Sequence, residues 1–398
     1  MGLSRLSPEL ILMVAESLDS EKATEKAINP LTRINRFFYS LLNPFLYRYH
    51  ARNDVELSAL QHAARRDLPG VIEHLVDAGV SLHSREAWFG YSFYRRPKYD
   101  HPIVLAANSD HANVMETLLD KEELTSGLTE RHFSDMMYWA VQDNQAKAVK
   151  VLLDRKVTDP WTDDPIIASA AERGRVDIVN LLLKDADERI KTGLLSETLR
   201  QRGIDEALLQ GIGTQNPKNI LTLLLKAGAD VNFVAKWGRI HLVPLGEAAH
   251  YKHVGAVKLL LEAGADPNLM KNRKWGPLAR AIQPWHGDIT YSWDPPGHEL
   301  EDPSRQPLPR PMSPSVREIF RLLFEYRAKP SRAGGSWALH RAVVYQCYEA
   351  AHLLIDKGAQ ITPSHVNDSQ QAALNQAVAD RDFEAIKALV PKEWSTDA

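Results

Sequence analysis

Histidine and cysteine are the residue types in this sequence that could perform acid–base, nucleophilic or metal chemistry. The fifteen histidines are dispersed, and there is a single cysteine, Cys347. His62 and His340 are interpreted as structural side chains that order a turn by hydrogen bonding. His250 and His253 cluster at a predicted turn, but no carboxylate lies at a metal-ligand spacing from them. These patterns predict no metal, no cofactor and no catalytic residue.

Sequence motifs of common enzymes are missing as well. There is no Gly-x-Gly-x-x-Gly or Walker-type loop for phosphates, no His-Glu-x-x-His, no Gly-x-Ser-x-Gly and no Cys-x-x-Cys. Catalytic groups can also converge from distant parts of a chain, so an atypical active site stays open as an alternative. We expect a protein that is not itself an enzyme.

Composition and charge narrow the class of protein further. The 398 residues are 44% hydrophobic and 25% charged, which is typical of a soluble protein. The apolar run from Leu10 to Ala15 is far shorter than the roughly 20 residues that span a bilayer, and no signal peptide is visible. A lone cysteine fits a reducing cytoplasmic or nuclear compartment. The net charge of −3 disfavours nucleic acid as the partner.

An alanine and a leucine recur together along most of the chain and indicate repeated helix pairs. Seven such pairs have the same spacing of 12 residues, and two more carry insertions. The spacing-matched pairs are Ala63/Leu75, Ala106/Leu118, Ala140/Leu152, Ala170/Leu182, Ala248/Leu260, Ala342/Leu354 and Ala377/Leu389, and the longer ones are Ala207/Leu224 and Ala281/Leu323. Glycine follows the leucine by four residues at Gly79, Gly228, Gly264 and Gly358, as expected for a left-handed helix stop. The pattern predicts about nine units.

Residues 244–271 contain this pattern in its most complete form. They read Pro-Leu-x-x-Ala-Ala, then Val-x-Leu-Leu-Leu, then Gly-Ala-Asp-x-Asn. The segment resembles an ankyrin repeat, whose period is roughly 33 residues. The resemblance implies an all-α solenoid over residues 58–398, with hairpins between repeats and a face that binds other proteins. A helix pair this short cannot bury its own apolar face, so neighbouring copies must stack.

Residues 1–50 do not fit the repeat. Ser7-Pro8-Glu9 and Asn29-Pro30 each start a predicted amphipathic helix. The segment resembles an F-box, a helical motif that docks a substrate receptor onto the adaptor subunit of a cullin-RING ubiquitin ligase. The resemblance implies adaptor contacts by Leu6, Pro8, Glu9, Leu10, Ile11, Val14, Leu31, Phe37 and Phe38. The sequence departs from the F-box pattern in its polar middle, residues 19–27. The alternative is an N-terminal cap for the array, followed by a linker at 51–57.

Aromatic and basic residues gather in the predicted connections between repeats. The largest group lies in a finger insertion at residues 83–101, and smaller ones follow later repeats. The predicted binding residues are Trp88, Tyr91, Tyr94, Arg95, Arg96, Trp161, Lys236, Trp237, Arg239, Lys274 and Trp275. Such side chains bind protein partners by cation–π and charge-assisted contacts. Each tryptophan could instead cover its neighbouring hairpin.

A second insertion, at residues 283–314, divides one repeat between its two helices. Eight of its residues are proline, which no helix tolerates, so an exposed loop or polyproline stretch is expected. Trp285, Tyr291 and Trp293 could fold back onto the array or serve a second partner.

Together these features predict an adaptor protein. The N-terminal helices would engage the ligase adaptor subunit, and the array would present a bound protein substrate for ubiquitin transfer, which is catalysis by proximity alone. One alternative is an ankyrin scaffold or inhibitor without a ligase role. A less favoured one is an enzyme with its substrate in a groove lined by Trp88, Trp237 and Trp275.

Overall fold

A computed structural model describes most of the chain, in two compact units, Met1–Pro160 and Trp161–Ala398. The described residues are 7–17, 36–53, 58–80, 101–125, 128–161, 165–237, 240–270, 276–282, 312–330, 333–345, 347–359 and isolated positions between 373 and 388. Among them, no helix is long and apolar enough to pass through a lipid bilayer.

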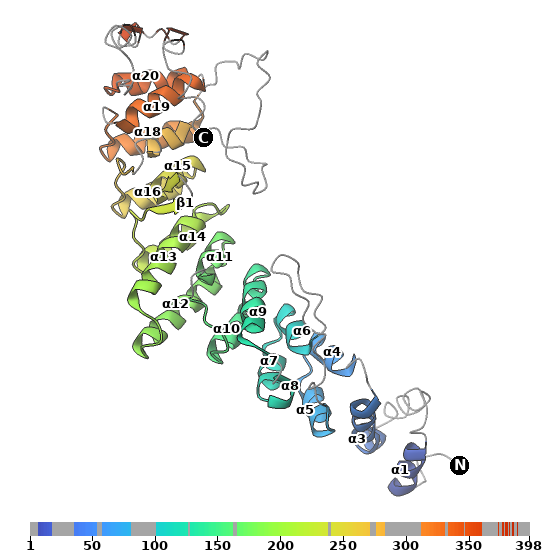
Figure 1. Cartoon of the computed structure of the whole chain (residues 1–398). Helices are drawn as coiled ribbons and strands as arrows, with labels where there is room; N and C mark the ends of the chain where they lie inside the picture. The colour runs from blue at the N-terminus through green and yellow to red at the C-terminus, as the bar shows by residue number, and fades with distance from the viewer. Residues whose placement is uncertain are drawn as a thin grey trace. The chain divides into compact units, whose positions relative to one another are not determined.

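The first unit is built from short helices in two layers (Figure 1). α4, α6 and α9 pack side by side as one layer, and α5, α7 and α10 form the other. Its helices are α1 (Pro8–Ser17), α3 (Arg36–Asn53), α4 (Ser58–Arg65), α5 (Pro69–Asp77), α6 (Pro102–Asn108), α7 (Ala112–Leu119), α8 (Glu122–Thr125), α9 (Glu130–Gln142) and α10 (Ala146–Asp154).

The second unit repeats this two-layer order. The first helices of successive pairs pack against one another from α11 through α13, α15 and α17 to α19, and the second helices do so from α12 through α14 and α16 to α18. Its elements are α11 (Ile166–Glu172), α12 (Val176–Lys191), α13 (Glu197–Gly211), α14 (Pro217–Lys226), β1 (Ala235–Trp237), β2 (Ile240–Leu242), α15 (Pro244–His250), α16 (Val254–Glu262), α17 (Pro277–Ile282), α18 (Pro314–Glu325), α19 (Ala333–Val344) and α20 (Tyr348–Asp356). The predicted stacking of helix pairs is confirmed within each unit.

The alanines and leucines that mark the repeats lie in the core. Each anchor alanine and leucine that the structure describes is buried, and Ala377, at 6%, is the most exposed of them. A small side chain is required where two first helices approach closely, and the leucine fills the space between the two layers. Leu389 lies outside the described residues, and the total of nine units stays a prediction.

Left-handed backbone positions end the helices, as the sequence predicted. Gly79, Gly228, Gly264 and Gly358 have φ between +84° and +94°, a conformation that costs glycine little. Their amides close the preceding second helix, for example Gly264 N–H to the carbonyl of Leu261 at 3.0 Å. These stops turn the chain into the connection that leads to the next repeat.

Asparagine side chains tie consecutive repeats of the second unit together. The Asn232 side chain accepts a hydrogen bond from the Asp266 amide at 2.8 Å and donates one to the Gly264 carbonyl at 3.4 Å. One repeat later, Asn268 accepts from the Lys329 amide at 2.7 Å. Because each side chain bridges to the equivalent position of the next repeat, these bonds fix the register of stacking.

The hairpin predicted around Lys236 is present. β1 and β2 pair antiparallel, with Lys236 opposite His241 and Trp237 opposite Ile240. The turn between them, residues 238–239, lies outside the described part.

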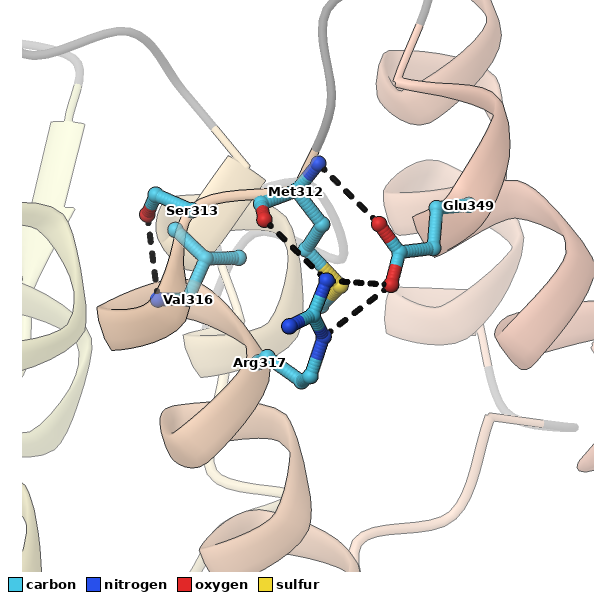
Figure 2. A network of polar contacts seen from close by, with 5 residues as sticks. All are labelled: Met312, Ser313, Val316, Arg317 and Glu349. Carbon is cyan, nitrogen blue, oxygen red and sulfur yellow. Dashed lines mark hydrogen bonds and ion pairs between the residues drawn. The ribbon is translucent and has the colours of Figure 1, made fainter.

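The proline-rich insertion rejoins the array at a defined point. Figure 2 shows the Glu349 carboxylate of α20 accepting hydrogen bonds from the Met312 amide at 3.2 Å and from Arg317 at 2.7 and 3.0 Å. Ser313 caps α18 by accepting from the Val316 amide at 3.3 Å. Met312 is buried and Pro314 begins α18, so the insertion ends earlier than the predicted residue 314. Residues 283–311 lie outside the described part.

Two other predicted boundaries also shift. α3 continues to Asn53, so the start of the predicted linker 51–57 belongs to a helix. His101 was placed in the first finger insertion, but it is the N-cap of α6 and its ring accepts from the Ile103 amide at 3.3 Å.

Candidate functional site

The predicted adaptor-binding residues divide into buried and exposed groups. Ile11 and Phe38 join Leu42, Phe45 and Leu46 in a small core between α1 and α3. Leu10 and Phe37 are about half exposed, and Pro8 is exposed. Leu6 and Leu31 lie outside the described residues, as do the side chains of Glu9 and Val14. The exposed Met13, which the sequence analysis did not single out, lies one turn after Leu10.

Most of the predicted aromatic and basic strip falls outside the described residues. This applies to Trp88, Tyr91, Tyr94, Arg95, Arg96, Arg239, Lys274 and Trp275, and to the side chain of Trp237. Lys236 is exposed on β1.

Trp161 corrects the predicted strip, because its side chain is interior. It is 1% exposed, and its indole N–H donates to Asp185 at 3.2 Å. Arg189 donates to the same carboxylate oxygen of Asp185 at 2.7 Å. Gly203 leaves room for the indole, since a Cβ there would lie 2.9 Å from the ring. Trp161 therefore stabilises the interior of the second unit and is left out of the binding surface.

A different group of charged side chains converges on the first-helix layer of the second unit. The residue directly before the anchor alanine is Glu247 on α15, Arg280 on α17 and Arg341 on α19. These helices pack consecutively, so the three positions line up across neighbouring repeats. His250 is the last residue of α15, and Lys252 lies in the turn that follows it. We call His250, Lys252, Arg280 and Arg341 the basic cluster.

Specific contacts hold the basic cluster together. Arg280 forms an ion pair with Glu247, and both side chains are about 10% exposed. The ammonium of Lys252 donates to the Arg280 carbonyl at 3.2 Å. Arg341 donates to the Tyr345 hydroxyl at 3.0 Å, and its guanidinium lies 5.7 Å from the ring centroids of both Trp337 and Tyr345. These contacts orient the charged groups and limit their movement.

Burial and mutual repulsion shift the pKa values of the cluster. Desolvation, followed by Arg280, lowers the pKa of Lys252 to about 7. Desolvation, followed by Arg280, Lys252 and Arg341, lowers the pKa of His250 to about 3. The Nδ1 atom of His250 is buried and has no hydrogen-bond partner in the described part of the chain. The cluster therefore concentrates positive charge where water solvates it poorly.

This arrangement suits binding of an anion better than catalysis. Arginines that stack on aromatic rings present a preorganised fork to a carboxylate. The cysteine of this region, Cys347, is partly buried, and burial raises the pKa of its thiol, which disfavours the nucleophilic thiolate.

The sequence analysis missed the basic cluster, although a signal was present. Aligning the repeats on their anchor alanines places Glu206, Glu247, Arg280 and Arg341 at one equivalent position. The signal lies at one position of the first helices and not in the connections between repeats, where the predicted binding residues are found.

Comparisons with known proteins agree with the repeat architecture. The family model described as "Ankyrin repeat" matches residues 242–272, and the one described as "Ankyrin repeats (many copies)" matches residues 339–390. The chain therefore contains ankyrin repeats.

The chain is also similar to a curated protein and to solved structures. It is 28% identical over 256 residues to the ankyrin repeat protein nuc-2 of Neurospora crassa, which covers 63% of this chain and 22% of that protein. The chain thus spans about a fifth of the length of this curated relative. An ankyrin repeat domain from Acinetobacter baumannii AYE is 19% identical with a TM-score of 0.31, and covers 66% of this chain and all of that one. The human ASB11 ankyrin repeat domain is 17% identical with a TM-score of 0.31, and covers 77% of this chain and 99% of that one.

Proposed function

Because ankyrin repeats imply a role in binding other proteins, we propose that this chain is a non-catalytic substrate receptor of a cullin-RING ubiquitin ligase. In this proposal the ankyrin array holds a protein substrate, and the N-terminal helices α1 and α3 dock onto the ligase adaptor subunit. The complex would act in the cytoplasm or nucleus by holding the substrate near the transferring enzyme.

The observation that supports the docking role is an exposed apolar group on α1 and α3. Leu10, Met13 and Phe37 are 48%, 62% and 47% exposed, whereas their neighbours Ile11 and Phe38 are buried. Apolar side chains exposed next to a small core are typical of a surface that a partner covers. This matches the F-box-like pattern of the same segment.

One observation favours the alternative of an ankyrin scaffold in which α1 and α3 only cap the array. α3 packs against α5, and the rings of Tyr47 and His74 lie 5.1 Å apart. The helix pair is thus joined to the first repeat in the manner of a terminal cap.

Co-purification with the ligase adaptor separates these functions. We expect the intact chain to capture the adaptor, and the variant Leu10→Asp with Phe37→Asp to lose it, because both side chains are exposed and would meet the partner. The control Ser109→Asp with Asn113→Asp adds the same charge at other exposed positions of the first unit and should still capture it. If the intact chain captures no adaptor, the ligase role is wrong and the scaffold alternative stands.

A further inference from the structure

Helix α3 has an open side in addition to the side that packs against α1. Phe37, Ser40 and Pro44 follow one another at spacings of four and three residues or fewer, and Tyr47 and Arg48 lie one turn further. This spacing places the five residues along one face of the helix. Tyr47 is partly buried, and the other four are exposed. We call these five residues the open side of α3.

The open side of α3 borders a groove whose other wall is α5. The groove has a volume of about 380 Å³, at the lower end of the roughly 300–1,000 Å³ range of pockets that hold small ligands. Its lining on α3 runs from Ser40 to Arg48, and on the other side it includes His74, Asp77 and Ala78. The α3–α5 groove therefore has room for an apolar side chain of a partner.

The α3–α5 groove is continuous with the apolar group that the proposed function assigns to docking. Phe37 belongs to that group together with Leu10 and Met13. The Ser40 hydroxyl donates to the Phe37 carbonyl at 3.0 Å, so the groove begins one turn after Phe37. Pro44 follows Phe37 by seven residues, a distance of about 10 Å along a helix. A partner that covers Phe37 would therefore reach the groove as well.

Charge indicates which partner surface suits α3. The sequence of this helix contains three arginines and no aspartate or glutamate. Arg48 lines the groove, and its Nε atom donates to the Pro44 carbonyl at 3.4 Å, which directs the guanidinium along the open side. Asp77 adds one carboxylate on the opposite wall. The α3 wall is thus complementary to a partner surface that carries carboxylates.

We infer that the docked partner inserts an apolar side chain into the α3–α5 groove and places a carboxylate next to it against Arg48. The inference rests on the proposed function, because the partner is the ligase adaptor subunit of that proposal. It extends the docking surface from the N-terminal helices to α5 of the first repeat. The first repeat would then contribute to adaptor binding, which a terminal cap does not require.

Isothermal titration of the full chain with the purified adaptor subunit tests the inference. Ala78→Phe fills the groove and should weaken binding roughly tenfold or more, because the partner's side chain loses its space. Ala263→Phe is the matched control. Ala78 and Ala263 directly follow α5 and α16 with the same φ of −80°, and Ala263 is exposed in the second unit. The control should bind as tightly as the intact chain.

A second variant tests the charge and keeps the inference falsifiable if Ala78→Phe does not fold, as judged by circular dichroism. Arg48→Glu changes an exposed side chain and should weaken the adaptor roughly 3- to 10-fold. Added NaCl should weaken the intact chain more than this variant, because it screens the pair that the variant lacks. Lys147→Glu makes the same charge change at an exposed site of α10 and should leave the affinity unchanged.

The outcomes separate the inference from the proposed function. Binding of the intact chain that neither folded Ala78→Phe nor Arg48→Glu weakens overturns the inference and leaves the ligase role. If the intact chain binds no adaptor, both fail. Light scattering of the chain alone checks for another occupant, since a dimer that Ala78→Phe dissociates would assign the groove to a second copy and overturn the inference.

Discussion

Two partly or fully buried charged groups in the second unit invite comparison. Around Trp161, one carboxylate, Asp185, receives hydrogen bonds from one indole and one guanidinium, and all three side chains are below 10% exposed. Around Glu247, one carboxylate faces a cluster of several cations. In the first group the carboxylate holds an interior tryptophan and an arginine, and in the second Arg280 contributes to lowering the pKa of both His250 and Lys252.

The two groups differ in how completely they are buried and in how many cations surround the carboxylate. Removing the carboxylate from either group should lower the stability of the fold, because a buried arginine loses its ion-pair partner. In the group around Glu247 a buried histidine lies among the cations, so the stability of this group should also depend on pH. The predictions below test this distinction.

The largest effect is expected for Asp185→Ala. This change leaves the buried Arg189 without its carboxylate and should lower the free energy of unfolding by about 3–5 kcal/mol. Urea denaturation followed by circular dichroism measures it. Asp187→Ala, which removes a largely exposed partner of Arg200, should cost no more than about 1 kcal/mol. Similar costs for both variants would contradict the structural role of the Trp161 group.

A smaller loss of stability is expected for Glu247→Gln. Removing this carboxylate exposes Arg280 to its cationic neighbours and should lower the free energy of unfolding by about 2–4 kcal/mol. Adding Arg280→Gln should recover part of the stability, because the arginine that lost its carboxylate is then neutral. Urea denaturation measures both variants, and a Glu247→Gln chain as stable as the intact one would contradict the role of this ion pair.

Acidification should lower the stability of the group around Glu247, because it contains His250. Its pKa is lowered to about 3 in the folded chain from an ordinary 6.5, so the unfolded chain binds the proton first. Stability is therefore full above pH 6.5 and falls as the pH drops toward the folded value, by about 1–3 kcal/mol between pH 6.5 and 4. His250→Gln should flatten this part of the profile in denaturation curves. If the stability of His250→Gln falls as steeply with pH as that of the intact chain, the folded protein does not hold this histidine neutral.

The smallest effect is expected at Gly203, which borders the Trp161 group. Gly203→Ala places a Cβ 2.9 Å from the indole and should cost about 1–2 kcal/mol after the gain in helix propensity. Gly255→Ala on α16 has open space around its new methyl group and should be neutral or stabilising by up to about 1 kcal/mol. Thermal unfolding of both variants checks the contrast, and a stabilised Gly203→Ala would mean that the indole does not pack there.

The sequence predicted the regular parts of the fold because they follow short-range rules. The anchor pairs, the glycine stops and the hairpin at Lys236 each depend on residues close together in the chain. Trp161 was predicted to be at the surface because its partner Asp185 lies 24 residues further along the chain, on α12. From the sequence alone, a tryptophan flanked by loop residues is expected to be exposed, because the distant residue that it packs against is not evident.

The candidate site was harder to predict for the same reason. Arg280 and Arg341 are 61 residues apart in the chain, with the proline-rich insertion between them. Only the stacking of α17 on α19 makes them neighbours. Arg280 and Arg341 occupy equivalent positions when the repeats are aligned, so their alignment could be predicted from the sequence. The lowered pKa values of His250 and Lys252 depend on their burial, which no sequence pattern predicts.

The most direct test of the central claim, that the first-helix layer holds a protein, is site-specific photo-crosslinking. A photoreactive residue is placed at Glu206 in the first-helix row, or at Lys258 on the exposed side of α16, and the chain is irradiated with its co-purified partner. We expect a crosslinked partner from position 206 and none from position 258. Crosslinking from 258 alone would place the partner on the second-helix layer and contradict the account.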